Sequence, residues 1–115
     1  MALATAASPS NVELILGTMG FGRYFKAVVT ARDVSQGKPH PEAYLMAASK
    51  LGLDAGSCLV LEDAILGVKA AKASGAVCLG LTTSHNKEHL RLAGADWVCR
   101  DLLDVPQELL TLIFD

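Results

Sequence analysis

The sequence predicts an α/β fold with a mainly parallel sheet, and two observations support this prediction. Short apolar runs alternate with stretches of helical periodicity along the 115 residues. In addition, 51% of the residues are hydrophobic but only 5% are aromatic, so Ala, Leu and Val must build the core. Strands that alternate with helices form parallel sheets with right-handed crossovers. At this length we expect one domain over residues 1–115.

The N-terminal part of the chain is expected to hold two strands with a helix between them. Residues 2–6 are small and apolar, as at the end of a strand. Ser8 and Pro9 fit the N-cap and the first position of a helix. Residues 27–29 then predict the next strand. The apolar stripe of the helix consists of Val12, Ile15, Leu16 and Met19.

In the middle of the chain the sequence predicts a polar loop, two helices and a strand. The loop covers residues 31–40, and Pro41 opens the first helix. Residues 58–61 form a continuous apolar run, which is typical of a central parallel strand. A helix rich in small residues follows over 64–74 and ends at Gly75. The residues of the first helix expected to face inward are Tyr44, Leu45, Ala48 and Leu51.

The last part of the chain continues the alternation. Residues 77–81 predict another buried strand, residues 86–93 a short helix, and residues 97–99 a short peripheral strand. A final helix is expected to present Val105, Leu109, Leu112 and Ile113 on one face.

Composition and charge exclude several classes of function. The net charge is −2 without any basic run, so the sequence predicts no binding to nucleic acid or to an anionic membrane. No segment reaches the roughly 18 apolar residues of a membrane span, and no signal peptide is evident. Cys58, Cys78 and Cys99 lack the paired spacing of a zinc site, which favours buried thiols in a reducing compartment. We therefore expect a cytoplasmic protein.

Polar residues of several units are expected to meet at one edge of the sheet. Each of them lies at or just after the carboxyl end of a predicted strand, or in the loop that follows it. Ligands of open parallel sheets bind at this edge. The residues are Thr5, Lys38, Glu62, Asp63, Thr82 and Thr83.

Glu62, Asp63 and Lys38 carry the strongest chemical signal. Two adjacent carboxylates repel each other, and burial raises their pKa unless a cation compensates. Mg²⁺ suits this role because it prefers hard oxygen ligands, often carboxylates with a phosphate. Lys38 lies between Gly37 and Pro39 and could neutralise a phosphate. The alternatives are that Asp63 caps the following helix and that Lys38 is a solvated loop lysine.

Other polar residues are weaker candidates. Thr5 could donate a hydrogen bond to a phosphate oxygen, although the sequence alone favours a capping role. Thr82, Thr83 and Ser84 could line the same edge, but such residues more often turn the chain and cap the next helix. His85 and His89 have a metal-compatible spacing, but without a third ligand a solvated helix face is favoured.

These motifs resemble those of the haloacid dehalogenase-like (HAD) superfamily, especially its phosphatase and β-phosphoglucomutase-like branch. Residues 37–42 around Lys38 are similar to the family's lysine motif, and residues 60–64 are similar to its acidic motif. Thr5 is the best match to the Ser/Thr that binds the transferred phosphoryl group.

The resemblance implies a Rossmann-like three-layer sandwich and Mg²⁺-dependent phosphoryl transfer from a small phosphorylated molecule. It also implies roles for four residues. Lys38 and Thr5 would bind the phosphoryl group as catalytic residues, Asp63 would bind the metal, and Glu62 would bind the metal or support it.

The sequence departs from this family in one respect. It contains no Asp-x-Asp, the motif that supplies the family's nucleophile and general acid/base. The chain resembles the C-terminal half of a core domain that lacks the nucleophile strand and the cap domain. We therefore expect activity to be absent or very weak, and the alternative is a non-catalytic module that binds Mg²⁺, phosphate or a partner chain.

In the family, the missing strand lies between the strand at residues 2–6 and the strand at residues 58–61. Unpaired buried strand edges are costly. We expect the two strands to pair directly, or a second copy of the chain to form a homodimer across the gap in the sheet.

Overall fold

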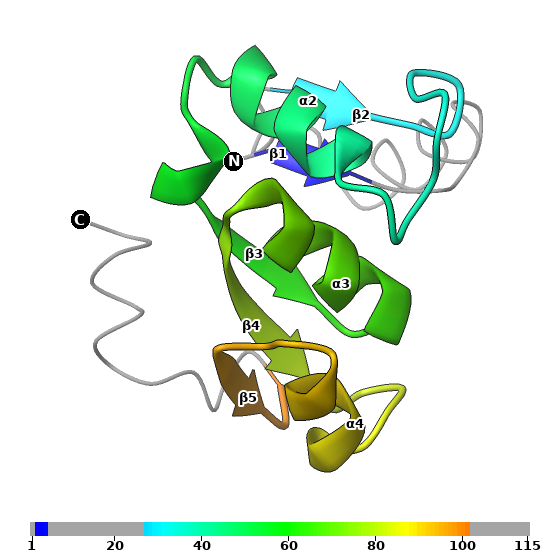
Figure 1. Cartoon of the computed structure of the whole chain (residues 1–115), viewed down its shortest axis with the longest axis vertical. Coiled ribbons are helices and arrows are strands. Elements are labelled where there is room, and N and C mark those ends of the chain that lie inside the picture. Colours follow the sequence, from blue (N-terminus) through cyan, green and yellow to red (C-terminus); the bar gives the residue numbers. More distant parts are fainter. Residues whose placement is uncertain (1, 5–26, 102–115) are drawn as a thin grey trace.

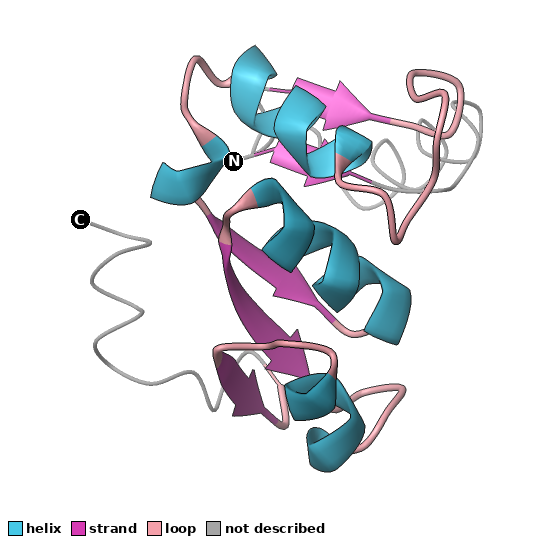
Figure 2. Cartoon of the chain, in the orientation of Figure 1, coloured by secondary structure: helices cyan, strands magenta, loops and turns pink. Residues whose placement is uncertain are grey.

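The computed structural model describes residues 2–4 and 27–101. Thr5, the helix predicted after Pro9 and the final predicted helix lie outside these residues. From residue 27 onward the described strands and helices alternate along the chain, as Figure 1 and Figure 2 show. In chain order they are β1 (Ala2–Ala4), β2 (Ala27–Val29), α2 (Glu42–Lys50), the 3₁₀ turn η2 (Ala55–Ser57), β3 (Leu59–Glu62), α3 (Ile65–Ser74), β4 (Val77–Leu81), α4 (Lys87–Leu92) and β5 (Trp97–Cys99).

The strands form two parallel sheets. β1 pairs with β2, and β3, β4 and β5 follow one another in a second sheet. Figure 1 shows α2 beside β1 and β2, α3 beside β3 and β4, and α4 near β5, and α2 also packs against α3. This architecture confirms the α/β fold with parallel strands. The longest described helix, α3, has 10 residues, and no described helix could cross a membrane.

Local signals explain where the described helices begin and end. α2 follows Pro41, with an acidic residue in its first turn and a basic one in its last, as the helix dipole favours. α3 ends at Gly75, which has a φ of 92°, a left-handed conformation that glycine adopts without strain. The side chain of Asn86 accepts a hydrogen bond from the His89 N–H at the start of α4.

The two faces of the β3–β4–β5 sheet bury different residues because side chains alternate along a strand. Val60, Cys78 and Val98 face the helices and join a cluster with Tyr44 of α2 and Val68 of α3. The residues on the other face that cluster together are Leu59, Leu79, Leu81 and Cys99. Glu62 has the parity of Val60, so its side chain is on the helix side of the sheet.

Three predictions about packing and pairing were wrong. Leu45 was expected to face inward, but it is 46% exposed on the outer side of α2. Among the described strands, β3 lies at the edge of its sheet and not in its centre: β4 is its only hydrogen-bonded neighbour there, and its residue Leu61 is 43% exposed. β1 and β3 do not pair directly, because they belong to separate sheets. Each of these two strands therefore has only one described neighbour.

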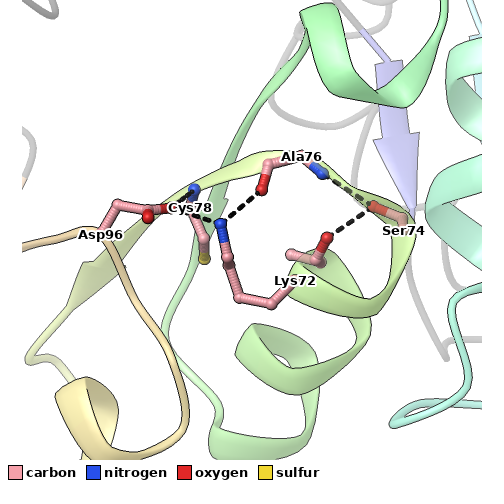
Figure 3. A network of polar contacts seen from close by, with 6 residues as sticks. Lys72, Ser74, Ala76, Cys78 and Asp96 are labelled. Carbon is pink, nitrogen blue, oxygen red and sulfur yellow. Dashed lines mark hydrogen bonds and ion pairs between the residues drawn. The ribbon is translucent and has the colours of Figure 1, made fainter.

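A polar network ties α3 to the amino-terminal end of β4 (Figure 3). Asp96 accepts hydrogen bonds from the Lys72 ammonium and from the buried Cys78 N–H, both at 2.8 Å, and Lys72 also donates to the Ala76 carbonyl. Burial raises the pKa of Asp96, but the Lys72 and Cys78 hydrogen bonds outweigh this and hold the pKa below its ordinary value. This ion pair lies at the opposite end of β4 from the predicted site.

Candidate functional site

The loop that carries Lys38 is held in place by the first residue of α2. The Glu42 carboxylate accepts hydrogen bonds from the backbone N–H groups of Ser35, at 2.8 Å, and Gln36, at 2.9 Å. The Glu42 N–H in turn donates to Nδ1 of His40 at 3.1 Å. Hydrogen bonds from the Ser35 and Gln36 amides hold the pKa of Glu42 below its usual value, so the Glu42 carboxylate is ionised at neutral pH. The loop therefore presents Lys38 from a defined backbone.

Glu62, at the end of β3, is the centre of the site. The Lys38 ammonium lies 3.0 Å from its Oε2, and the Tyr44 hydroxyl donates to the same oxygen. Its Oε1 accepts from the N–H groups of Asp63 and Ala64, each at 3.2 Å. Only 10% of the Glu62 side chain and 21% of the Lys38 side chain are exposed. Lys38 and Glu62, 24 residues apart in sequence, thus meet at the predicted edge.

Tyr44 is a residue that the sequence placed in the core without a polar role. It is 9% exposed, and the Lys38 ammonium lies 4.9 Å from the centre of its ring, within the range of a cation–π interaction. Burial raises the pKa of the Tyr44 hydroxyl, and the hydrogen bond to Glu62 raises it further. The hydroxyl therefore stays a donor at neutral pH. The sequence offered one indication of this role, because a tyrosine expected in the core needs a hydrogen-bond partner for its hydroxyl.

Asp63 is oriented by the loop after β4. Its Oδ2 accepts hydrogen bonds from Ser84 Oγ at 2.8 Å and Thr83 Oγ1 at 3.3 Å, and its carbonyl lies 3.1 Å from Nδ1 of His85. The Ser84 hydrogen bond is the main cause that holds the pKa of Asp63 below its ordinary value, so this carboxylate is ionised at neutral pH. The sequence analysis favoured a turn-forming role for Thr83 and Ser84 and did not predict these contacts with Asp63.

The alternative in which Asp63 caps α3 is wrong. The N-cap is Ala64, whose N–H donates to Glu62 and not to Asp63. Thr82 extends the sheet, because its N–H donates to the Cys99 carbonyl at 2.9 Å. His89 is exposed on α4, as predicted for a solvated helix face, whereas His85 precedes this helix and is half-buried beside the Asp63 carbonyl.

Gly67 leaves space for the Glu62 side chain. A Cβ at this position of α3 would overlap Cγ, Cδ and Oε2 of Glu62. Glu62 can therefore lie over the first turn of α3 only because residue 67 has no side chain. The sequence predicted a helix rich in small residues here, but not that one of them makes room for a carboxylate.

Asp63 and Glu62 differ in how well they meet the requirements of a Mg²⁺ ligand. Asp63 fits, since it is ionised and supplies the hard oxygen ligand that Mg²⁺ prefers. Glu62 is already engaged by Lys38, Tyr44 and two amides, which suits a supporting role. Within residues 2–4 and 27–101 there is no cluster of three or more His, Cys, Asp or Glu residues. A Mg²⁺ ion on Asp63 would need further ligands from water, phosphate or other residues.

Comparisons with known proteins agree with these motifs. A family model described as "haloacid dehalogenase-like hydrolase" matches residues 1–75. The chain is 40% identical to validoxylamine A 7'-phosphate phosphatase of Streptomyces hygroscopicus subsp. limoneus, over 91% of this chain and 48% of that protein. It is also 40% identical to 2-deoxyglucose-6-phosphate phosphatase 2 of Saccharomyces cerevisiae, over 90% of this chain and 46% of that protein. The chain thus spans about half the length of these relatives.

A solved structure shows the same similarity. The β-phosphoglucomutase of Clostridium difficile superposes with a TM-score of 0.82 at 26% identity, covering 96% of this chain and 46% of that protein. The fold is therefore shared along nearly the whole chain.

Proposed function

Because the chain belongs to the haloacid dehalogenase-like hydrolase family, we propose that its site binds the phosphoryl group of a small phosphorylated metabolite together with Mg²⁺. The observation that carries this proposal is the pairing of Lys38 with Glu62 at 3.0 Å, next to the ionised Asp63. A cation and a carboxylate then stand side by side at the edge where parallel sheets bind ligands. The two relatives are named as phosphatases of phosphorylated small molecules, which supports this substrate class.

Each residue has a separate role in this proposal. Lys38 neutralises the phosphoryl oxygens through the N–H groups that Glu62 does not use. Asp63, oriented by Ser84, would hold Mg²⁺, and Glu62 would support the metal site. Mg²⁺ would neutralise phosphoryl charge in such a site. Thr5 would donate to a phosphoryl oxygen, as its motif predicts.

Turnover by this chain is proposed to be absent or very weak. A covalent route needs an attacking carboxylate, and the sequence contains no Asp-x-Asp. We therefore expect binding without efficient hydrolysis. A cytoplasmic location is also part of the proposal, in keeping with the metabolite substrate.

The proposal is tested by titrating the purified chain with orthophosphate in the presence and absence of Mg²⁺, using calorimetry, beside an assay of aryl phosphate hydrolysis. We expect Mg²⁺ to strengthen phosphate binding, and Asp63→Asn to lower Mg²⁺ affinity by about tenfold or more. Asp54→Asn is the matched control, because Asp54 is exposed and makes no side-chain cap bond at η2. A folded wild-type chain that binds no phosphate under either condition would refute the proposed function.

A second proposal concerns a partner chain. We propose that two copies of the chain form a homodimer through β3, at the gap between the β1–β2 sheet and the β3–β4–β5 sheet. The single described neighbour of β3 and the 43% exposure of Leu61 support this proposal. Sedimentation over a range of concentrations should show a dimer that Leu61→Lys weakens. A monomer at every concentration would exclude it.

A further inference from the structure

Tyr44 is the residue on which the two charged groups of the site converge. Its ring lies under the Lys38 ammonium, and its hydroxyl donates to the Glu62 oxygen that Lys38 also contacts. We propose that Tyr44 is a positioning residue, which holds Lys38 by its ring and shares Glu62 by its hydroxyl so that Lys38 keeps N–H donors for phosphoryl oxygens. This inference rests on the proposed function.

The count of donors and acceptors supports this role. A carboxylate has about four acceptor positions, and those of Glu62 are matched by Lys38, Tyr44 and the N–H groups of Asp63 and Ala64. An ammonium has three N–H donors, and Glu62 takes one from Lys38. Without the Tyr44 hydroxyl, Oε2 of a side chain only 10% exposed would lack one donor. The Lys38 ammonium already contacts this oxygen and could replace the lost donor with a second N–H, which would then not be available to a phosphate.

The ring supports Lys38 by a different route. A cation above an aromatic face is attracted by the ring's quadrupole and does not need to direct an N–H at a lone pair. Tyr44 is 9% exposed and packs in a cluster with Val68 and Cys78, so the ring itself is fixed. A rigid ring below the ammonium and a carboxylate beside it define the position of Lys38 from two directions.

Two variants separate the ring from the hydroxyl. Tyr44→Phe keeps the ring and removes the donor, whereas Tyr44→Leu removes both. We expect Tyr44→Phe to weaken orthophosphate binding about tenfold, as for loss of a hydrogen bond to a charged group, and Tyr44→Leu to weaken it further. Ser74→Ala is the control: it removes a hydroxyl that donates to the Ala71 carbonyl at the other end of α3, and should leave phosphate binding unchanged.

A spectroscopic signature distinguishes positioning from a general loss of structure. The ring should shift the NMR resonance of the Lys38 ε-methylene group, which is assigned by its absence from Lys38→Met. We expect the shift in the wild-type chain and in Tyr44→Phe, and its loss in Tyr44→Leu. Tyr44→Phe keeps the buried ring, so it remains informative even if Tyr44→Leu does not fold.

The experiments on Tyr44 distinguish a failure of this inference from a failure of the proposed function. Weaker phosphate binding by a folded Tyr44→Phe, with the lysine resonance still shifted, supports the inference. Wild-type affinity in Tyr44→Phe overturns it. If the wild-type chain itself binds no phosphate, the proposed function fails, and the lysine resonance decides the remaining question: an unshifted resonance in the wild type overturns a positioning role for Tyr44.

Discussion

Replacing Lys38 with methionine is expected to reduce orthophosphate affinity by about a hundredfold and to lower the free energy of unfolding by about 2 kcal/mol. The change removes the cation of the site and leaves the Glu62 carboxylate, which is 10% exposed, without its charged partner. Tyr44 and two amides still donate to Glu62, which limits the loss of stability. Calorimetric phosphate titration and urea unfolding measure the two effects.

Lys72→Met is the matched control for this prediction. Like Lys38, Lys72 forms an ion pair with a carboxylate, here that of Asp96 at 2.8 Å. The side chains of Lys72 and Asp96 are, however, 33% and 38% exposed. Solvent screens such a pair, so we expect a loss of about 1 kcal/mol or less and no change in phosphate affinity. Equal effects of the two substitutions on phosphate binding would contradict the assignment of Lys38 to the site.

Replacing Gly67 with alanine is expected to lower stability by about 2 kcal/mol although alanine is the better helix former. The new Cβ would overlap the Glu62 side chain, which must then leave its position over α3. The displaced carboxylate loses Lys38, Tyr44 and two amides together, and the buried Tyr44 hydroxyl loses its acceptor. Phosphate affinity should fall as well, since Lys38 is no longer held.

A double-mutant cycle with Glu62→Ala tests this explanation. Once Glu62 is truncated, the overlapping atoms are gone, and Gly67→Ala should stabilise α3 by up to about 1 kcal/mol. The sign of its effect therefore reverses between the two backgrounds, with an interaction energy of about 3 kcal/mol. The same effect in both backgrounds would show that Glu62 does not lie over Gly67.

Much of the fold followed from local patterns. Residues 77–81 and 97–99 were predicted as strands with the bounds that β4 and β5 have, because an apolar run between a glycine and a polar turn has few other interpretations. The helix predicted over 64–74 differs from α3 by one residue. Burial was harder to predict: Leu61 lies in an apolar run but is 43% exposed, on the face of the sheet that points away from α2 and α3.

The site was predictable in outline only. Lys38, Glu62 and Asp63 were identified because a cation and two carboxylates follow strand ends, and the topology of a parallel sheet brings such ends together. The sequence placed Tyr44 in the core and gave Ser84 only as a weaker candidate for this edge. It did not pair either residue with a carboxylate, because a hydroxyl on a helix or in a turn has the same sequence signature whether or not it faces one.

By itself, the sequence determined the alternation of strands and helices, the edge of the sheet that carries the charged residues, and the family. Only the tertiary structure decided which groups satisfy Glu62 and Asp63, that Gly67 admits the Glu62 side chain, and that β1 and β3 stay in separate sheets. The physical reason is the range of the interactions. Periodicity and capping act between neighbours in sequence, whereas the contacts of the Glu62 and Asp63 carboxylates join residues about twenty apart. The geometry of these contacts depends on how the helices pack against the sheet.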